Sequence, residues 1–145
     1  MKIFNKRAKF NYILDEKFEA GIVLSGDEVK AFRHGAVDIT HSFGKITENE
    51  AYLINANFAV EKDQTRPRKL LMHKKEIISI DTKIKAKKLT FVPTKMYTKH
   101  GNIKVELALG KGKKKFEKKE SIKRADIERN AEKELRGEKD NKNRI

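Results

Sequence analysis

The sequence contains no cysteine among its 145 residues. This absence excludes disulfide bonds, thiolate zinc sites and cysteine nucleophiles, and it fits a reducing compartment. Long apolar runs are also missing. None approaches the roughly 18 residues of a membrane-spanning helix, and the N-terminal segment lacks the apolar stretch of a signal peptide. We therefore expect a cytoplasmic protein with no membrane partner.

Acidic residues are too few to balance the basic ones. The chain has 35 Lys and Arg against 21 Asp and Glu, a formal net charge of +14. A potential of this sign attracts polyanions; nucleic acid is the commonest partner, and a membrane surface is the weaker alternative. Hydrophobic residues make up 37% of the chain, which suffices for one modest core. Composition therefore predicts one folded domain that binds nucleic acid.

The C-terminal part of the chain differs in pattern from the rest. Residues 111–145 hold 14 basic and 8 acidic residues, so they contribute +6 of the charge and residues 1–110 contribute +8. Four large apolar residues in this part do not follow the spacing of a core-facing helix: Phe116, Ile122, Ile127 and Leu135. So little apolar area does not offset a backbone ordering cost of roughly 1 to 2 kcal/mol per residue. We predict a folded domain over residues 1–110 and a basic tail over 111–145 that is disordered in the free protein.

Alternating apolar residues predict β-strands within the first 110 residues. Two such sets are Phe18, Ala20, Ile22, Leu24 and Ile103, Val105, Leu107, Leu109. Tight-turn signals at residues 47–50 and 99–102 join further pairs of strands. We predict about six antiparallel strands, near residues 10–14, 18–24, 38–46, 51–58, 89–98 and 103–109.

A short helix is predicted after the second of these strands. Ser25 and Glu28 have the spacing of a capping box, which begins a helix, and Gly35 is suited to end it. Val29 and Phe32 would form its inner face.

A second helix is predicted to begin at Thr65, with Pro67 in its first turn. Its apolar face repeats at seven-residue spacing in the pairs Leu70, Leu71 and Ile77, Ile78. This helix would lie between the fourth and fifth strands. The order of elements predicts a mainly β fold with flanking helices, namely an oligonucleotide-binding-type antiparallel β-barrel of about six strands.

Motifs that indicate catalysis are scarce. The four histidines lack the close helical spacing of a metal site, and no glycine-rich loop precedes a helix as a phosphate cradle would. Glu28 and Lys30 form an E-x-K triplet of the kind used by metal-dependent nucleases, where the carboxylate holds the ion and the lysine polarises the attacking water. Such triplets arise often by chance in a chain with 39% charged residues. We expect no catalytic residue, metal or cofactor, and a nuclease is the alternative from another class.

Basic residues gather where the second helix is predicted to begin. They are Arg66, Arg68, Lys69, Lys74 and Lys75. At a helix N-terminus the backbone N–H groups and the helix dipole also favour phosphate. An ordinary solvated face is the alternative, but the positive charge of the whole chain favours contact with RNA.

Four blocks between residues 5 and 129 carry a resemblance over nearly the whole chain. They read "NKRAKFNYILDEKFEAGIVLSGDEVKAFRHG", "AYLINANF", "TRPRKLLMHKKEI" and "LTFVPTKMYTKHGNIKVELALGKGKKKFEKKESIKRADIER". Their order and spacing resemble those of the small protein B family, the tmRNA-binding partners in bacterial trans-translation. The resemblance implies a monomeric, non-enzymatic protein whose oligonucleotide-binding-type barrel binds the tRNA-like domain of tmRNA near its elbow.

The resemblance also implies residues of the RNA-binding surface. They are Glu28 and Lys30 of the E-V-K block, together with Asn55, Leu89 and Lys111. Because like charges repel, we expect Glu28 to hydrogen-bond bases or 2′-hydroxyls, or to hold a basic neighbour, instead of touching phosphate. Capping its own helix is an equally good account of Glu28.

For the tail, the resemblance implies a helix that forms in the vacant mRNA channel of a stalled ribosome, near the decoding centre. Charge on every side suits a helix surrounded by ribosomal RNA. The residues expected to contact the ribosome are Lys113, Lys114, Lys115, Lys118, Lys119, Lys123, Arg124 and Arg129. Two positions depart from the family: Glu117-Lys118-Lys119 replaces the usual D-K-R, and Ile127 replaces the usual tryptophan, so an apolar contact would replace stacking there.

The implied partners are therefore tmRNA and the ribosome, with elongation factor Tu involved only indirectly through alanyl-tmRNA. A third hypothesis, a general RNA chaperone or a ribosomal protein, predicts no preference for tmRNA.

Overall fold

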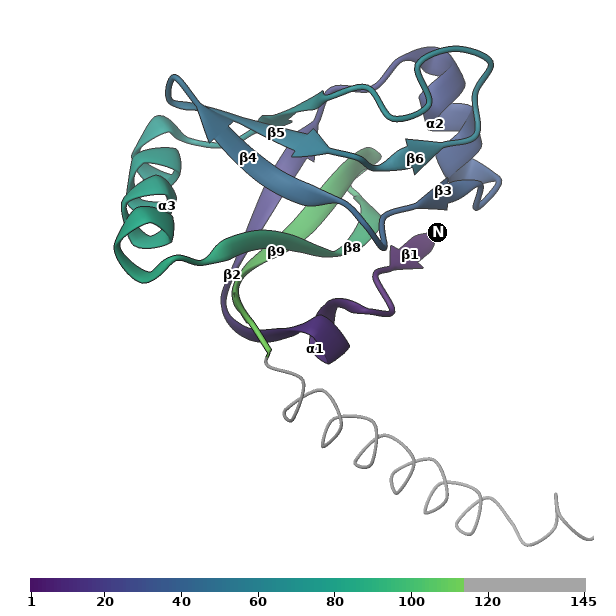
Figure 1. Ribbon diagram of the computed structural model, residues 1–145. Coiled ribbons are helices and arrows are strands. Elements are labelled where there is room, and N and C mark those ends of the chain that lie inside the picture. The colour runs from purple at the N-terminus through teal and green to yellow at the C-terminus, as the bar shows by residue number, and fades with distance from the viewer. Residues whose placement is uncertain (114–145) are drawn as a thin grey trace, which may run out of the picture. The chain divides into compact units, whose positions relative to one another are not determined.

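The computed structural model describes residues 1–113. Its elements are β1 (Lys2–Phe4), α1 (Ala8–Asn11), β2 (Tyr12–Ile22), α2 (Gly26–Arg33), β3 (Val37–Asp38), β4 (Phe43–Thr47), β5 (Glu50–Ile54), β6 (Asn57–Phe58), β7 (Arg68–Leu71), α3 (Lys74–Lys87), β8 (Thr90–Lys99) and β9 (Asn102–Gly112) (Figure 1). None of the helices in this part of the chain is long and apolar enough to cross a membrane.

Six strands close into an antiparallel barrel. Around the ring they follow the order β8, β4, β5, β7, β2, β9, and β9 pairs again with β8; β1 is added outside the ring, on β8. The ring closes between β4 and β8 through the pair Gly44 and Phe91. A Cβ atom at residue 44 would overlap the Phe91 ring, so only glycine permits this approach. The predicted mainly β barrel fold is confirmed.

Both predicted tight turns are present. In the β4–β5 turn, Thr47 pairs with Glu50, and the two central residues, Glu48 and Asn49, have φ of 51° and 62°. In the β8–β9 turn, His100 and Gly101 have φ of 51° and 79°. Two central residues with positive φ define the turn whose twist matches a hairpin.

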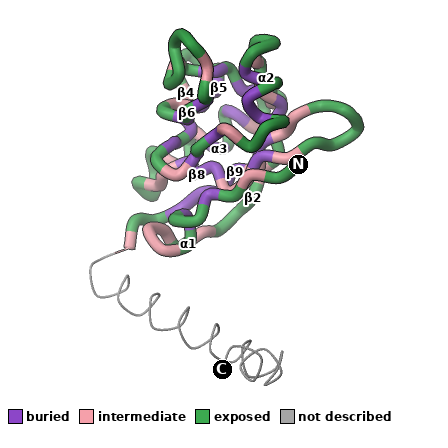
Figure 2. Tube along the Cα trace, turned by 90° about the vertical axis from the view of Figure 1, so that its right-hand side faces the viewer, coloured by how far each residue is buried: buried purple, intermediate pink, exposed green. Residues whose placement is uncertain are grey.

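The barrel interior forms one hydrophobic core. Its largest fully buried apolar side chains are Phe32, Ile39, Leu53, Phe58, Leu70, Ile80, Phe91, Met96, Leu107 and Leu109. Buried positions recur along β8, β9 and α2 (Figure 2), while α2 and α3 lie on opposite sides of the barrel (Figure 1). The α2 helix is confirmed with Phe32 buried and Val29 half-buried.

The predicted start of the second helix is wrong. Residues 68–71 form strand β7, and the helix, α3, begins only at Lys74. Along β7, Leu70 faces the core, where it pairs with Ala51 of β5, while Leu71 faces outward. The barrel needs a strand between β5 and β2, and this tertiary demand outweighs the local helix signal. The seven-residue apolar repeat therefore spans a strand and a helix.

The extents of the predicted strands also differ from the observed ones. Phe10 lies in α1, and the strand that follows runs without interruption from Tyr12 to Ile22, with a bulge between Leu14 and Lys17. The segment 38–46 divides into β3 and β4, and the segment 51–58 divides into β5 and β6 at Asn55, whose φ is 65°. Strand β9 continues to residue 112, two residues past the predicted domain boundary.

Candidate nucleic-acid interface

Glu28 begins α2 through the predicted capping box. The Ser25 hydroxyl oxygen accepts a hydrogen bond from the Glu28 N–H at 3.2 Å, and Glu28 Oε1 accepts one from the Ser25 N–H at 2.8 Å. Both halves of the capping box are therefore present. Only 2% of Glu28 is exposed, so its side chain has almost no surface to offer to RNA.

Two arginines from a distant segment hold the same carboxylate. Arg66 Nη2 donates to Glu28 Oε1, Arg66 Nε donates to Oε2 at 3.1 Å, and Arg68 Nε donates to Oε2 at 2.5 Å. Burial raises the pKa of Glu28, but the bonds from Arg66, Ser25 and Arg68 outweigh it and hold the pKa below its ordinary value. Because both oxygens are engaged, the carboxylate does not fit the metal ligand of the nuclease hypothesis. Glu28 instead holds basic neighbours.

Arg68 is fully buried. Its Nη1 donates to the carbonyl oxygens of Ala56 at 2.8 Å and Arg66 at 3.0 Å, and its Nη2 donates to that of Gln64 at 3.0 Å. The guanidinium also lies 4.0 Å from the Phe58 ring centroid. The prediction that Arg68 lies at a helix N-terminus is therefore wrong, because Arg68 begins strand β7. Its guanidinium is not accessible to RNA and holds the loop between β6 and β7 from inside.

The other predicted residues near this cluster lie at the surface. Lys30 is exposed on α2, and Asn55 is exposed at the turn between β5 and β6. The Arg66 side chain is 36% exposed while it holds Glu28. Lys69, on the outer face of β7, forms an ion pair with Glu50 at 3.4 Å.

Leu89 and Lys111 lie at the other end of the barrel. Lys111 is exposed and pairs with Ile13 at the start of β2, whereas α2 follows the end of the same strand. Leu89 is half-buried and packs against the core immediately before β8. The predicted RNA-binding residues therefore do not form one cluster. Lys113 is half-buried, and the remaining predicted tail contacts, Lys114, Lys115, Lys118, Lys119, Lys123, Arg124 and Arg129, lie outside the described residues.

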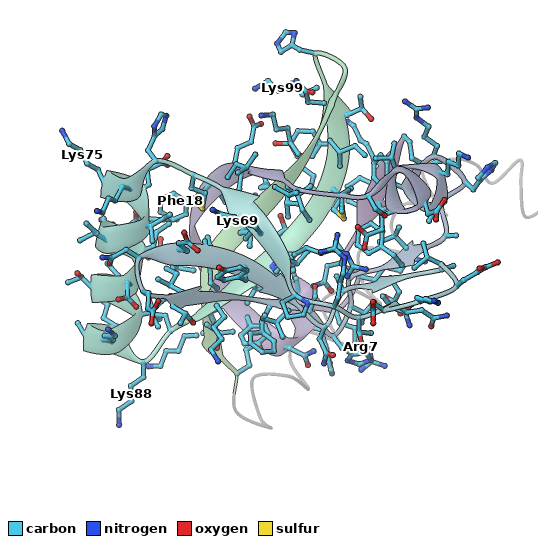
Figure 3. All side chains as sticks on the ribbon, turned by 90° about the horizontal axis from the view of Figure 1, so that it is seen from above. Arg7, Phe18, Lys69, Lys75, Lys88 and Lys99 are labelled. Atoms are coloured by element: carbon cyan, nitrogen blue, oxygen red, sulfur yellow. The ribbon has the colours of Figure 1, made fainter. Side chains whose placement is uncertain are left out.

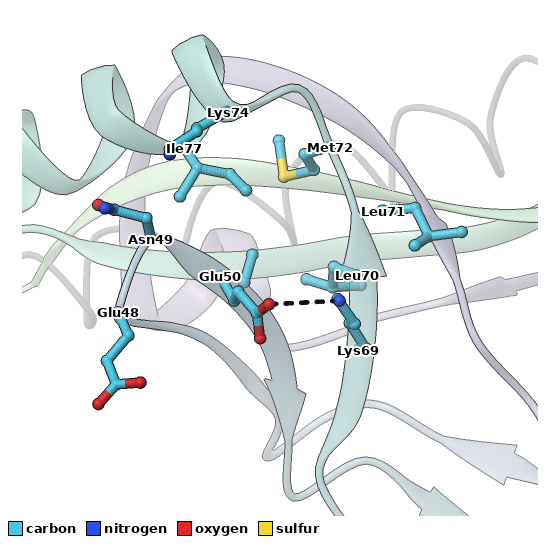
Figure 4. A pocket seen from close by; sticks show the side chains of 10 residues that line it. Glu48, Asn49, Glu50, Lys69, Leu70, Leu71, Met72, Lys74 and Ile77 are labelled. Carbon is cyan, nitrogen blue, oxygen red and sulfur yellow. Dashed lines mark hydrogen bonds and ion pairs between the residues drawn. The ribbon is translucent and has the colours of Figure 1, made fainter.

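Of the basic residues predicted at a helix N-terminus, only Lys74 and Lys75 lie at the start of a helix, α3. Lys74 and Lys75 open the helix, and Figure 3 shows Lys75 and Lys88 pointing away from it. A groove lies between the β4–β5 turn, β7 and α3, and two glutamates and two lysines line it. Glu50 and Lys69 of this set form an ion pair (Figure 4), so the charges of the groove are balanced. Its balanced charge gives a polyanion no preference for this groove.

Another candidate RNA-binding surface lies on the outer face of the sheet formed by β7, β2, β9 and β8. Leu71 of β7 pairs with Gly21 of β2, Gly21 pairs with Lys104 of β9, and Lys104 pairs with Tyr97 of β8. Leu71 lies so close to Gly21 that a Cβ atom added at residue 21 would be 3.2 Å from the Leu71 Cβ. The Leu71 side chain is nevertheless 54% exposed. This row therefore presents an exposed apolar side chain and a lysine on one outer face of the sheet.

Glu19 lies on the same outer face of the sheet, two residues before Gly21 along β2. Its Oε2 accepts a hydrogen bond from the Tyr97 hydroxyl and lies 3.3 Å from Lys99 Nζ. The bond from Tyr97 is the main cause that lowers the pKa of Glu19, against the opposing effect of burial. We call Glu19, Leu71, Tyr97, Lys99 and Lys104 the Glu19–Leu71 face.

The chemistry of this face suits structured RNA. A fixed carboxylate can accept hydrogen bonds from 2′-hydroxyls and base amino groups, lysines bind phosphate, and the leucine can contact a sugar or a base. Strand alternation already implied that Glu19 and Lys104 point outward. Strand alternation did not predict that Leu71 belongs to this face, because residue 71 was assigned to a helix. Its pairing with Gly21 depends on a strand distant in sequence.

Comparisons with known proteins all point to one family. The family model described as SmpB protein matches residues 2–137. An SsrA-binding protein of Sulfurihydrogenibium sp. (strain YO3AOP1) is 49% identical over 140 residues, and one of Persephonella marina (strain DSM 14350 / EX-H1) is 45% identical over 140 residues; each match covers 92% of both chains.

A solved structure is similar as well. It is described as "tmRNA-SmpB: a journey to the center of the bacterial ribosome", and the superposition has a TM-score of 0.66 at 39% identity, covering 86% of this chain and 96% of that one. The family match spans the barrel and most of the basic segment that follows it. The chain therefore belongs to the SmpB protein family.

Proposed function

We propose that this protein binds the tRNA-like domain of tmRNA and acts with it in trans-translation, the rescue of stalled ribosomes with tagging of the nascent peptide. The observation that carries the proposal is the similarity to SsrA-binding proteins over 92% of the chain. The net charge of +14 supports it, because a polyanionic partner is required. The role is one of binding, not catalysis, and its site is the cytoplasm, where ribosomes translate.

The Glu19–Leu71 face is the surface we assign to the tRNA-like domain. Lys99 and Lys104 would bind phosphates, while the Glu19 carboxylate, held by Tyr97, would read hydroxyl or amino groups. Leu71 would cover a sugar or base and exclude water there. Glu28 and Arg68 join the start of α2 to β7 from inside the fold and need not touch RNA.

The basic segment 111–145 has a separate role in the proposal. It would occupy the vacant mRNA channel and reach the decoding centre, where its net +6 would meet ribosomal phosphate. The protein would act as a monomer that meets elongation factor Tu only through alanyl-tmRNA.

One experiment tests the proposal directly. The tagged full-length chain is expressed in a bacterium that contains tmRNA, and the RNA that co-purifies with it is sequenced. We expect tmRNA to be enriched above ribosomal RNA and tRNA. Equal recovery of all structured RNAs would favour a general RNA chaperone or a ribosomal protein instead.

A second experiment distinguishes an RNA-binding protein from a nuclease. The purified protein is mixed with a transcript of the tRNA-like domain in Mg²⁺, and the RNA is followed on a denaturing gel. We expect a stable complex with intact RNA, whereas cleavage that disappears in Lys30→Ala, a change at an exposed position, would support a nuclease.

A further inference from the structure

A cleft of about 390 Å³ lies between β1, α1 and β2, against β8. This volume is in the range of pockets that bind a small ligand or a single nucleotide. Ala8 and Asn5, both buried, and Leu14, half-buried, contribute to its floor. None of the functions discussed above uses this cleft.

The floor of the cleft is held by Asn5. Its Nδ2 donates to the Pro93 carbonyl oxygen at 2.8 Å, and its Oδ1 accepts from the Arg7 N–H at 3.1 Å. The Asn5 N–H donates to the Thr94 carbonyl oxygen at 2.8 Å. These three bonds tie the end of β1 and the start of α1 to β8, so the cleft exists before any ligand arrives.

The charges around the cleft are strongly one-sided. Lys6, Lys9, Lys17 and Lys95 line it against one acidic residue, Glu106. That carboxylate already accepts a hydrogen bond from the Thr94 hydroxyl and lies 4.0 Å from Lys95 Nζ. By contrast, the groove in Figure 4 has two lysines against two glutamates, and the groove beside α2 has two basic residues against four acidic ones. The cleft therefore attracts an anion more strongly than either groove does.

An aromatic ring stands beside these lysines. Phe4 is 58% exposed, and its strand position pairs directly with Lys95. The exposed part of the Phe4 ring can stack on a nucleotide base. Such stacking requires no particular sequence, because every base has a flat aromatic face. A ring for stacking with lysines around it for phosphate is the combination that binds single-stranded nucleic acid without demanding one sequence.

We propose that this cleft binds one nucleotide of single-stranded RNA, with the base stacked on Phe4 and the adjoining phosphates held by Lys6, Lys17 and Lys95. The site adjoins the Glu19–Leu71 face, because Glu106 pairs with Glu19 and Lys95 Nζ lies 5.4 Å from the Tyr97 ring centroid, but it takes a different ligand. Its ligand is unpaired, because a base inside a duplex presents no free face to Phe4.

The test uses full-length protein and hexauridylate containing one 4-thiouridine. Irradiation should cross-link the RNA to a peptide within residues 1–9, identified by mass spectrometry. Phe4→Ala should reduce that cross-link and weaken hexauridylate binding about five- to tenfold, the lower part of the range for loss of one stacked base. Phe4→Tyr should restore both, while Phe43→Ala, at another exposed phenylalanine (37%), should change neither.

Charge and base dependence give a second readout. Lys17→Gln should lower the slope of log affinity against log salt by about 0.7, as for one phosphate contact with a single strand. Lys85→Gln, at a 75% exposed lysine of α3, is its control and should leave the slope unchanged. An abasic ribose-phosphate oligomer of the same length should bind Phe4→Ala and the unmodified protein equally.

Three results would overturn the proposal. One is hexauridylate binding that Phe4→Ala leaves unchanged. Another is an equal loss of affinity for the tRNA-like domain in Phe4→Ala, which would make the cleft part of that interface. The third is a Phe4-dependent affinity for anionic phosphatidylglycerol vesicles without one for RNA. Failure of the proposed function is recognised separately, because it would abolish binding of the tRNA-like domain by the unmodified protein.

Discussion

Glu28 and Arg68, 40 residues apart in sequence, form a buried ion pair, with Arg68 Nε 2.5 Å from Glu28 Oε2. Their side chains are 2% and 0% exposed, so neither charge is hydrated. The pair joins the start of α2 to β7. Glu28, which with Lys30 resembled a nuclease or RNA-binding motif in sequence, therefore has a structural role.

Removing one member of this pair should destabilise the fold. Glu28→Gln leaves the Arg68 guanidinium buried without a counter-charge, a change that costs about 3 to 5 kcal/mol in buried pairs. We expect a loss of this order in the free energy of unfolding by urea. Lys30→Ala, at an exposed position two residues along α2, is the control and should stay within about 0.5 kcal/mol of the unmodified protein. Equal stability of Glu28→Gln and the unmodified protein would contradict the structural role.

Acid should weaken the same link. The pKa of Glu28 is lowered from 4.5 by its bonds to Arg66, Ser25 and Arg68, which outweigh the opposing effect of burial. A carboxyl group whose pKa is lower in the folded state adds stability above its unfolded pKa, and this stability is lost as the pH falls through the folded pKa. The unfolding free energy of the unmodified protein should therefore fall below about pH 4.5. In Glu28→Gln the fall should be shallower, and identical slopes in urea titrations between pH 5 and 3 would exclude this residue as a cause.

Barrel closure should depend on Gly44. In Gly44→Ala the added methyl group overlaps the Phe91 ring at the only β4–β8 pair of the described residues, and overpacking of this kind costs about 1 to 3 kcal/mol. We expect a lower thermal midpoint by calorimetry. Gly26→Ala is the matched control, because nothing lies within 4 Å of its new methyl group. A similar thermal midpoint for both variants would show that the close approach of Gly44 to Phe91 is not needed for stability.

The Glu19–Leu71 face should govern affinity for the tRNA-like domain without affecting the fold. Leu71→Ala removes an exposed apolar contact, and we expect about a tenfold weaker complex, the scale of a contact worth roughly 1.4 kcal/mol. Ile78→Ala truncates a 46% exposed side chain on α3 and should leave the affinity unchanged. Titration by fluorescence anisotropy measures both variants. Equal affinities would remove Leu71 from the interface.

The basic tail should be needed for rescue more than for tmRNA binding. A chain stopped after Gly112 keeps the barrel and its lysines, so we expect most of the affinity for the tRNA-like domain to remain. Tagging of a nascent peptide on ribosomes stalled at a message end should nevertheless fail. Changing Lys118, Lys119, Lys123 and Arg124 together to Glu should have the same effect, because it reverses the charge expected against ribosomal phosphate.

Two outcomes would contradict this division of roles. Normal tagging by the shortened chain would remove the tail from rescue. A parallel loss of tmRNA binding and tagging would place residues 113–145 in the tmRNA interface instead.

Features that depend on neighbouring residues could be predicted from the amino-acid sequence alone. The Ser25 and Glu28 capping box is formed by groups three residues apart, and the turns at 47–50 and 99–102 depend on the φ preferences of their own central residues. The alternation in β2 and β9 likewise predicted which side chains face the core. The barrel class and the basic tail followed from patterns of this local kind and from family resemblance.

The roles of Arg68 and Leu71 depend instead on long-range contacts in the folded barrel. Local preference favoured a helix through both, but closing the barrel required a strand there, because β5 and β2 each offered unpaired backbone groups to β7. As a strand, it buries the Arg68 guanidinium beside Glu28 and turns Leu71 outward over Gly21. Burial and cross-strand neighbours depend on residues distant in sequence, so no local pattern could assign one arginine to the core and one leucine to the surface.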